Sequence, residues 1–82
     1  MMQTPLYNEP EKQDNAADIA YFISFCIEYY SNSHKIPGNE ASEILSRTGT
    51  LEYLMSNYDV IHTQSPQWIL SDMDDFIKQH KP

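Results

Sequence analysis

Residues 18–30 read Asp-Ile-Ala-Tyr-Phe-Ile-Ser-Phe-Cys-Ile-Glu-Tyr-Tyr, and this stretch decides the fold. Its apolar side chains recur at steps of three and four residues, which places them on one face of an α-helix. Asp14 or Asn15 can accept hydrogen bonds from the first backbone N–H groups, so the helix is predicted to begin there. A face this wide indicates a helix at the centre of the domain. It comprises Ile19, Phe22, Ile23, Cys26, Ile27 and Tyr30, widened by Tyr21, Phe25 and Tyr29.

The residues before this helix have a different composition. Residues 1–14 are largely polar and include Pro5 and Pro10. The sequence predicts a flexible N-terminal tail over residues 1–14, because polar termini with few apolar anchors are poorly ordered. A chain of 82 residues is one domain's length, so residues 15–82 are predicted to form a single helical domain.

Two short helices are predicted after the first one. Ser31–Gly38 has turn composition, and its Pro-Gly ending blocks a continuing helix. Asn39 is the predicted cap of the second helix, and Gly49 is its predicted stop. Thr50 is the predicted cap of a third, short helix.

The last helix is predicted to begin at Ser65-Pro66, a capping hydroxyl followed by proline at the first helical position. In an alternative interpretation, Trp68–Leu70 is a short strand and the helix begins at Ser71. The single helix is favoured.

An irregular segment is predicted before the last helix. Residues 59–64 contain the adjacent β-branched pair Val60 and Ile61, which favours an extended and partly buried chain. The sequence as a whole therefore predicts an all-α fold. We expect a compact bundle of four helices with a central first helix and this irregular segment before the last one.

Charge and composition exclude several functions. Twelve Asp and Glu residues against five Lys and Arg give a formal net charge of -7, which disfavours nucleic acids and anionic membranes as partners. An acidic surface suits a basic protein partner or serves solubility alone. The single cysteine excludes an intramolecular disulfide, no stretch is long and apolar enough to span a membrane, and no signal peptide is evident. The bacterial cytoplasm is the expected location.

No catalytic, cofactor-binding or metal-binding residues are predicted. Cys26 lies on the apolar face of the first helix, where a thiol is usually inert. The three histidines lack metal-ligand spacing, and Asp72, Asp74 and Asp75 lack the glycine and terminal Glu of a calcium loop. His62 follows Asp59 by three residues, a pair that suits catalysis or a structural tie within a loop. The structural role is favoured, and the protein is expected not to be an enzyme.

The candidate functional surface is the stretch from Tyr58 to Trp68. Six tyrosines and one tryptophan cannot all be buried in so small a core, and exposed aromatic side chains are enriched at protein interfaces. The alternative, that these side chains only line the edge of the core, stays open. The predicted partner-binding residues are Tyr58, Asp59, His62, Gln64 and Trp68.

The order of these features resembles a bacterial family. Phe-Cys-Ile-Glu-Tyr-Tyr at 25–30, the segment 58–64 ending in His-Thr-Gln, and Asp-Met-Asp-Asp-Phe-Ile at 72–77 carry the resemblance. The chain is similar to small proteins catalogued as domain of unknown function family thirty-seven ninety-one. This resemblance implies no activity or catalytic residues. It implies a neighbouring gene for a protein similar to ADP-ribosyltransferases, and hence an antitoxin-like or accessory partner role.

The sequence therefore favours a non-enzymatic, acidic protein-interaction module that needs no cofactor. Its expected partner is a protein, and the product of a neighbouring gene is the first candidate. The alternative is a self-associating domain that buries its aromatic side chains in a homodimer. A small hydrolase or transferase built on His62 and Asp59 is the third hypothesis.

Overall fold

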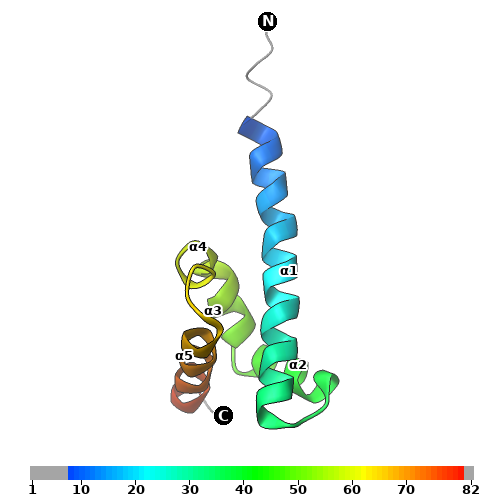
Figure 1. Ribbon diagram of the computed structural model, residues 1–82, viewed down its shortest axis with the longest axis vertical. Coiled ribbons are helices and arrows are strands. Elements are labelled where there is room, and N and C mark those ends of the chain that lie inside the picture. Colours follow the sequence, from blue (N-terminus) through cyan, green and yellow to red (C-terminus); the bar gives the residue numbers. More distant parts are fainter. Residues whose placement is uncertain (1–7, 81–82) are drawn as a thin grey trace, which may run out of the picture.

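The computed structural model describes residues 8–80 of the chain, with side chains from residue 16 onward, and all of its regular structure is helical (Figure 1). No strand occurs between residues 8 and 80, and the predicted all-α fold is confirmed. The helices are α1 (Asn8–His34), α2 (Gly38–Arg47), α3 (Thr50–Ser56), α4 (Tyr58–Ile61) and α5 (Pro66–Gln79).

The first helix is central, as predicted, because α1 contacts α2, α3 and α5. In Figure 1 the shorter helices gather around the C-terminal half of α1, while its N-terminal part extends beyond them. Phe22, Cys26 and Tyr30 of α1 are buried, and Ile23 and Ile27 are packed against the core at its edge. Each large apolar side chain that is fully buried contributes about 1.5–3 kcal/mol before entropy is counted. The core is completed by Ala41, Leu45, Leu54, Ile61, Ile69 and Met73.

The predicted start of the first helix is wrong. The helix begins at Asn8 rather than near residue 15, so residues 8–14 of the predicted tail are helical. Pro10 does not prevent this, because the first backbone N–H groups of a helix have no intrahelical partner and proline is tolerated there. Residues 1–7 of the predicted tail lie outside the described residues, and its flexibility stays a prediction.

The end of α1 also differs from the prediction, because the helix continues through Ser31 to His34. Lys35 then adopts the left-handed conformation, with φ 59°. The Ile36 N–H donates to the Ser31 carbonyl at 3.1 Å, and the Ser31 hydroxyl donates to the Ile36 carbonyl at 2.6 Å. This is the Schellman pattern of a helix C-terminus, with lysine at the position that glycine usually occupies.

The predicted caps of the second and third helices are wrong as well. The Pro37 carbonyl accepts the first helical hydrogen bond, from Ala41 N–H, so Asn39 lies inside α2. Gly49, with φ 82°, occupies the cap position of α3 without a side-chain hydrogen bond, so Thr50 is already the first helical residue.

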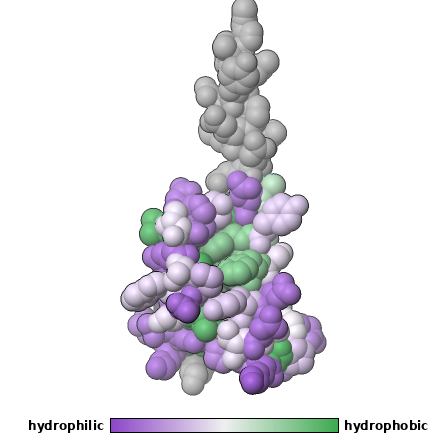
Figure 2. Space-filling view, viewed as in Figure 1, coloured by the Kyte–Doolittle hydropathy of each residue, from purple (hydrophilic) through white to green (hydrophobic). Residues whose placement is uncertain are grey.

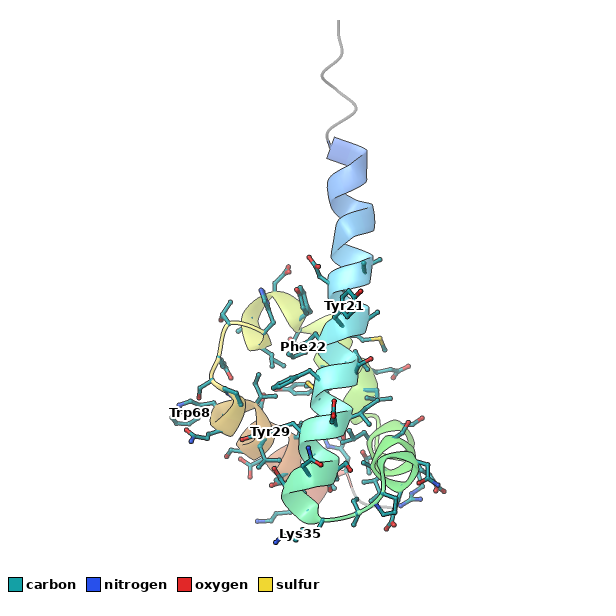
Figure 3. The ribbon with its side chains drawn as sticks, turned by 45° about the vertical axis from the view of Figure 1, so that its right-hand side comes forward. Tyr21, Phe22, Tyr29, Lys35 and Trp68 are labelled. Atoms are coloured by element: carbon teal, nitrogen blue, oxygen red, sulfur yellow. The ribbon has the colours of Figure 1, made fainter. Side chains whose placement is uncertain are left out.

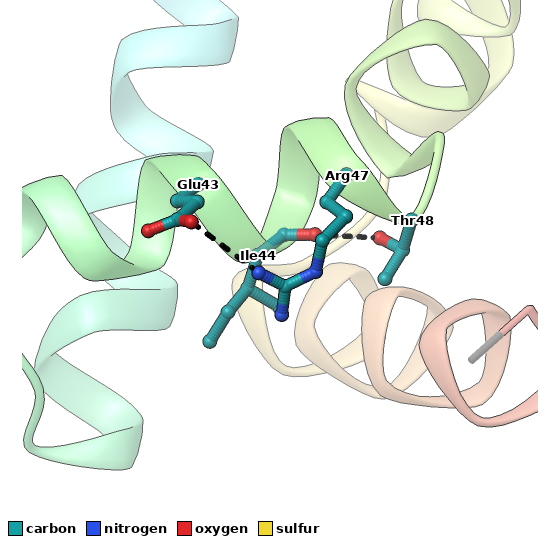
Figure 4. Close-up of polar contacts among 4 residues, drawn as sticks. All are labelled: Glu43, Ile44, Arg47 and Thr48. Carbon is teal, nitrogen blue, oxygen red and sulfur yellow. Dashed lines mark hydrogen bonds and ion pairs between the residues drawn. The ribbon is translucent and has the colours of Figure 1, made fainter. Parts of the chain in front are cut away.

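A buried pair of hydroxyl groups joins α2 to α3. The Thr48 hydroxyl donates to the Ile44 carbonyl at 2.8 Å, next to an exposed Arg47–Glu43 pair (Figure 4). Because its single proton is used there, Thr48 Oγ1 must accept from the Thr50 hydroxyl, 2.6 Å away. The two threonines thus satisfy each other inside the joint.

The segment before the last helix is helical rather than extended. The Ile61 N–H donates to the Asn57 carbonyl at 2.9 Å, so residues 58–61 form one turn, α4. Backbone hydrogen bonds within this turn outweigh the modest strand preference of Val60 and Ile61. Ile61 is buried, as expected, whereas Val60 is exposed.

The predicted start of the last helix is confirmed. Ser65 is the cap of α5, its hydroxyl accepts from the Trp68 N–H at 3.4 Å, and Pro66 is the first helical residue. The alternative strand over residues 68–70 is therefore wrong.

Candidate functional site

Two grooves flank the segment from residue 58 to residue 68. The α1–α4 groove has a volume of about 430 Å³ and lies between α1 and the residues around α4. The α3–α5 groove has a volume of about 410 Å³ and lies between α3, α4 and α5. Gln64 lines both of them, so the two grooves adjoin.

The structure divides the predicted partner-binding residues between these grooves. Tyr58 and His62 line the α1–α4 groove, and Trp68 lines the α3–α5 groove. Gln64 contributes to both, whereas Asp59 is exposed and lines neither. The structure thus brings four of the five residues to two connected hollows on one edge of the molecule.

Tyr58 is the centre of the α1–α4 groove. Its ring packs edge-on against Phe22, with ring centroids 5.4 Å apart, and it stacks on His62 at 4.1 Å. Burial raises the pKa of the Tyr58 phenol, and the carboxylates of Asp18 and Asp59 raise it further. The phenol therefore stays protonated and can donate a hydrogen bond at neutral pH.

His62 is anchored by the backbone. Its Nδ1 lies 2.6 Å from the Tyr58 carbonyl oxygen, and because a carbonyl only accepts, Nδ1 carries the proton. Among the described residues, no hydrogen bond joins His62 to Asp59. This geometry gives His62 the tie within the loop that the sequence favours.

Tyr53 connects α3 to α5 in the other groove. Its hydroxyl donates to Asp72 Oδ2 at 2.9 Å, and its ring stacks on Phe76 at 4.5 Å. Burial raises the pKa of the Tyr53 phenol, and the hydrogen bond to Asp72 and its charge raise it further. Asp75 also lines this groove, which is therefore acidic as well as aromatic.

Large aromatic side chains are exposed beside both grooves. Trp68 is 69% exposed and points outward from α5, away from α1 (Figure 3), and Tyr21 on α1 is 76% exposed. Phe25 is exposed too and stacks on Tyr29. On the face seen in Figure 2, hydrophobic side chains gather between α1 and the helices α3 and α4.

The prediction missed the site's contribution from α1, because it placed Tyr21 and Phe25 on the buried face. Helical rotation was the signal that could have corrected it. At about 100° per residue, Tyr21 lies about 140° and Phe25 about 100° around the helix from Cys26, the centre of the buried face. Both side chains therefore face solvent and line the α1–α4 groove.

Metal binding and membrane crossing each require a recognisable structural feature. Among the side chains of residues 16–80, no three of His, Cys, Asp or Glu gather where a metal ion could be held. No described helix combines the length and apolar character that crossing a membrane requires.

The fold and the paired grooves define a small, acidic, all-α protein with an aromatic edge. The family described as "Protein of unknown function (DUF3791)" has a model that matches residues 21–80, which is more than half of the chain. The chain belongs to this family. Neither the comparison with curated proteins nor the comparison with solved structures gave a match.

Proposed function

We propose that this protein is a non-enzymatic protein-binding module whose contact surface is the edge formed by residues 58–68 and the facing part of α1. One observation carries the proposal: four large apolar side chains are exposed around two grooves that adjoin at Gln64. They are Tyr21, Phe25, Val60 and Trp68.

Physical chemistry supports a protein as the partner. Trp and Tyr dominate the binding energy of many protein interfaces because each buries a large, rigid area. Covering such side chains with a partner gains about 25 cal/mol for each Å² of apolar surface removed from water. The formal net charge of -7 favours partners with a basic surface and opposes phosphate backbones.

The particular partner comes from the resemblance alone. It suggests an antitoxin-like or accessory role in the bacterial cytoplasm, with the ADP-ribosyltransferase-like product of a neighbouring gene as partner. An acidic module that covers a basic surface of such a protein would act by steric occlusion, with no cofactor and no chemistry of its own.

Sedimentation of the purified chain with the neighbouring gene product tests the proposal. We expect a complex at micromolar concentration that Trp68→Ala weakens. Met55→Ala is the matched control, because Met55 is an exposed apolar residue that lines neither groove. Absence of a complex with any neighbouring product, or equal weakening by both substitutions, would count against the proposed surface.

Self-association is the second candidate, favoured by the same exposed apolar side chains. A homodimer would bury them against a second copy, although two chains of equal negative charge repel each other. Sedimentation of the chain alone over a range of concentrations separates the two. A dimer that Trp68→Ala dissociates and that ignores the neighbouring product would replace the first proposal.

The enzyme hypothesis ranks third. This hypothesis pairs His62 with Asp59, whereas the described hydrogen bond of His62 Nδ1 goes to the Tyr58 carbonyl and not to the Asp59 carboxylate. His62→Ala is expected to lower stability rather than any turnover.

A further inference from the structure

The α1–α4 groove has an apolar floor between aromatic walls. Phe22 and Ile69 are nearly fully buried at its base. Tyr21 and Phe25 stand on the α1 side, and Tyr58 stands on the opposite side. A groove built in this way accepts large apolar side chains from a ligand, because they would leave water and meet aromatic faces.

One carboxylate lines the groove, and a second lies on the neighbouring helix α4. Asp18 lies on α1 and lines the groove, and Asp59, which does not line it, is exposed on α4 directly after Tyr58 in the chain. Tyr58 lines the groove, and burial raises the pKa of its phenol, which the charges of Asp18 and Asp59 raise further. Among the side chains of residues 16–80, no Lys or Arg lines the groove, so its described edge complements positive charge.

The shape favours a helical ligand. Between residues 8 and 80 there is no strand whose edge an extended peptide could join, and an apolar groove beside a helix matches the mode in which an amphipathic helix lays its apolar face into a groove. The α1 side of the groove runs from Asp18 to Phe25, a rise of about 10 Å, or about two turns of a bound helix.

We infer that the α1–α4 groove binds a basic amphipathic helix of the partner protein, with apolar side chains on the Phe22–Ile69 floor and Lys or Arg side chains at Asp18 and Asp59. This inference rests on the proposed protein-binding function and specifies which kind of partner segment the groove binds. A Leu or Phe at every third or fourth position, flanked by basic residues, is the expected pattern in the partner.

A synthetic helix of leucine and lysine with helical periodicity is the first probe. Its control is the same peptide with glutamate in place of lysine. Binding is measured by calorimetry and mapped by amide chemical shifts, while the single tryptophan reports separately on the α3–α5 groove. We expect the leucine–lysine peptide to change the amide chemical shifts of residues 18–25 and 58–62, with little change in Trp68 fluorescence.

Charge-neutralising variants locate the contact. The double variant Asp18→Asn/Asp59→Asn is compared with Glu40→Gln/Glu52→Gln, which removes the same number of exposed charges away from both grooves. Loss of two exposed ion pairs should weaken the leucine–lysine peptide roughly tenfold, and the control double should weaken it less than about twofold because it removes only long-range attraction. Circular dichroism checks that both variants fold.

Three results would overturn the inference. The first is that both double variants weaken binding of the leucine–lysine peptide equally. The second is that the leucine–glutamate peptide binds with the same affinity as the leucine–lysine peptide. The third is that neither peptide binds at concentrations at which the natural partner saturates the protein. If the neighbouring product binds the wild type and the Asp18→Asn/Asp59→Asn variant equally, the groove assignment fails while the protein-binding function stands. If neither the peptide nor any neighbouring product binds, both fail.

Discussion

The two ends of the molecule use α1 differently. At the closed end, residues 26–34 of α1 pack against α2 and α5, and Cys26, Leu45 and Met73 are fully buried. At the open end, residues 18–25 face the segment 58–68 across a groove, and Tyr21 and Trp68 are mostly exposed. The difference teaches that one helix can supply stability at one end and a surface for recognition at the other.

Polar contacts reinforce this contrast. At the closed end, His34 Nε2 lies 3.0 Å from Asp74 Oδ1 and links α1 to α5 across 40 residues of sequence. The Schellman pattern at Lys35 fixes the turn into α2. At the open end, the hydrogen bonds of His62 and Thr63 stay within residues 58–63, so they hold the local loop and leave the groove open.

The largest expected effect is a cavity at the closed end. Leu45→Ala removes a side chain with no exposed surface and should lower the free energy of unfolding by about 3 kcal/mol, against a total of roughly 5–15 kcal/mol for a domain. Val60→Ala, at an exposed position of the open end, should change it by less than about 0.5 kcal/mol. Urea unfolding followed by circular dichroism measures both, and equal losses would break the comparison.

The next effect is alkaline destabilisation through the buried thiol. Burial raises the pKa of Cys26 from 9.0 to about 12. The folded state then holds a proton that the unfolded state releases, so this contribution is complete below pH 9.0 and is lost as the pH rises toward about 12. By about pH 10.5 the loss should be roughly 2 kcal/mol.

Cys26→Ala is the control for this pH dependence. The tyrosines at 30, 53 and 58 also have raised pKa values, and they titrate in both proteins. The difference between the two stability profiles therefore isolates the thiol. Parallel profiles from pH 9 to pH 10.5 would show that Cys26 ionises without unfolding the closed end.

A smaller, asymmetric effect is expected at the joint between α2 and α3. Thr48→Val leaves the fully buried Thr50 hydroxyl without an acceptor and should cost about 2 kcal/mol. Thr50→Val removes only a donor to Thr48, whose own proton is already bonded to Ile44, and should cost about 1 kcal/mol. Thermal and urea unfolding of both variants would test which substitution costs more stability. A larger cost for Thr50→Val would mean that the Thr48 hydroxyl donates to Thr50 rather than accepting from it.

The smallest effect on stability is expected at Trp68. Trp68→Ala should change the free energy of unfolding by less than about 0.5 kcal/mol, because the side chain is mostly in water. Ile69→Ala, one residue later but nearly fully buried, should cost about 3 kcal/mol. Urea titrations of this neighbouring pair sharpen the comparison, and a costly Trp68→Ala would mean that the open end is part of the core.

Local sequence was sufficient to predict the helices that carry strong signals. The three- and four-residue spacing from Phe22 to Tyr30 and the Ser65-Pro66 start both act within a few residues, and both predictions are confirmed. Val60 and Ile61 were predicted wrongly because backbone bonds to Asn57 and its neighbours set their conformation. The preference of these β-branched side chains for extended structure is weaker than those backbone hydrogen bonds.

The sequence could predict one wall of the candidate site but not the wall opposite it. Tyr58, His62 and Gln64 lie within seven residues of sequence, so their proximity could be anticipated. The opposite wall at Tyr21 and Phe25 depends on how α4 packs beside α1, about 40 residues away in sequence. Helical rotation indicates that these two rings lie off the buried face of α1, but only the tertiary arrangement shows which segment lies opposite them.

The left-handed Lys35 leaves room for engineering. An L-residue in this conformation costs roughly 1–2 kcal/mol relative to a right-handed one, and the Schellman bond and the packing of Ile36 hold it in place. Glycine would adopt the same φ without that penalty. The Lys35→Gly variant should therefore be more stable than the original chain. Destabilising substitutions elsewhere could then be studied in this background, because the doubly substituted proteins would still fold.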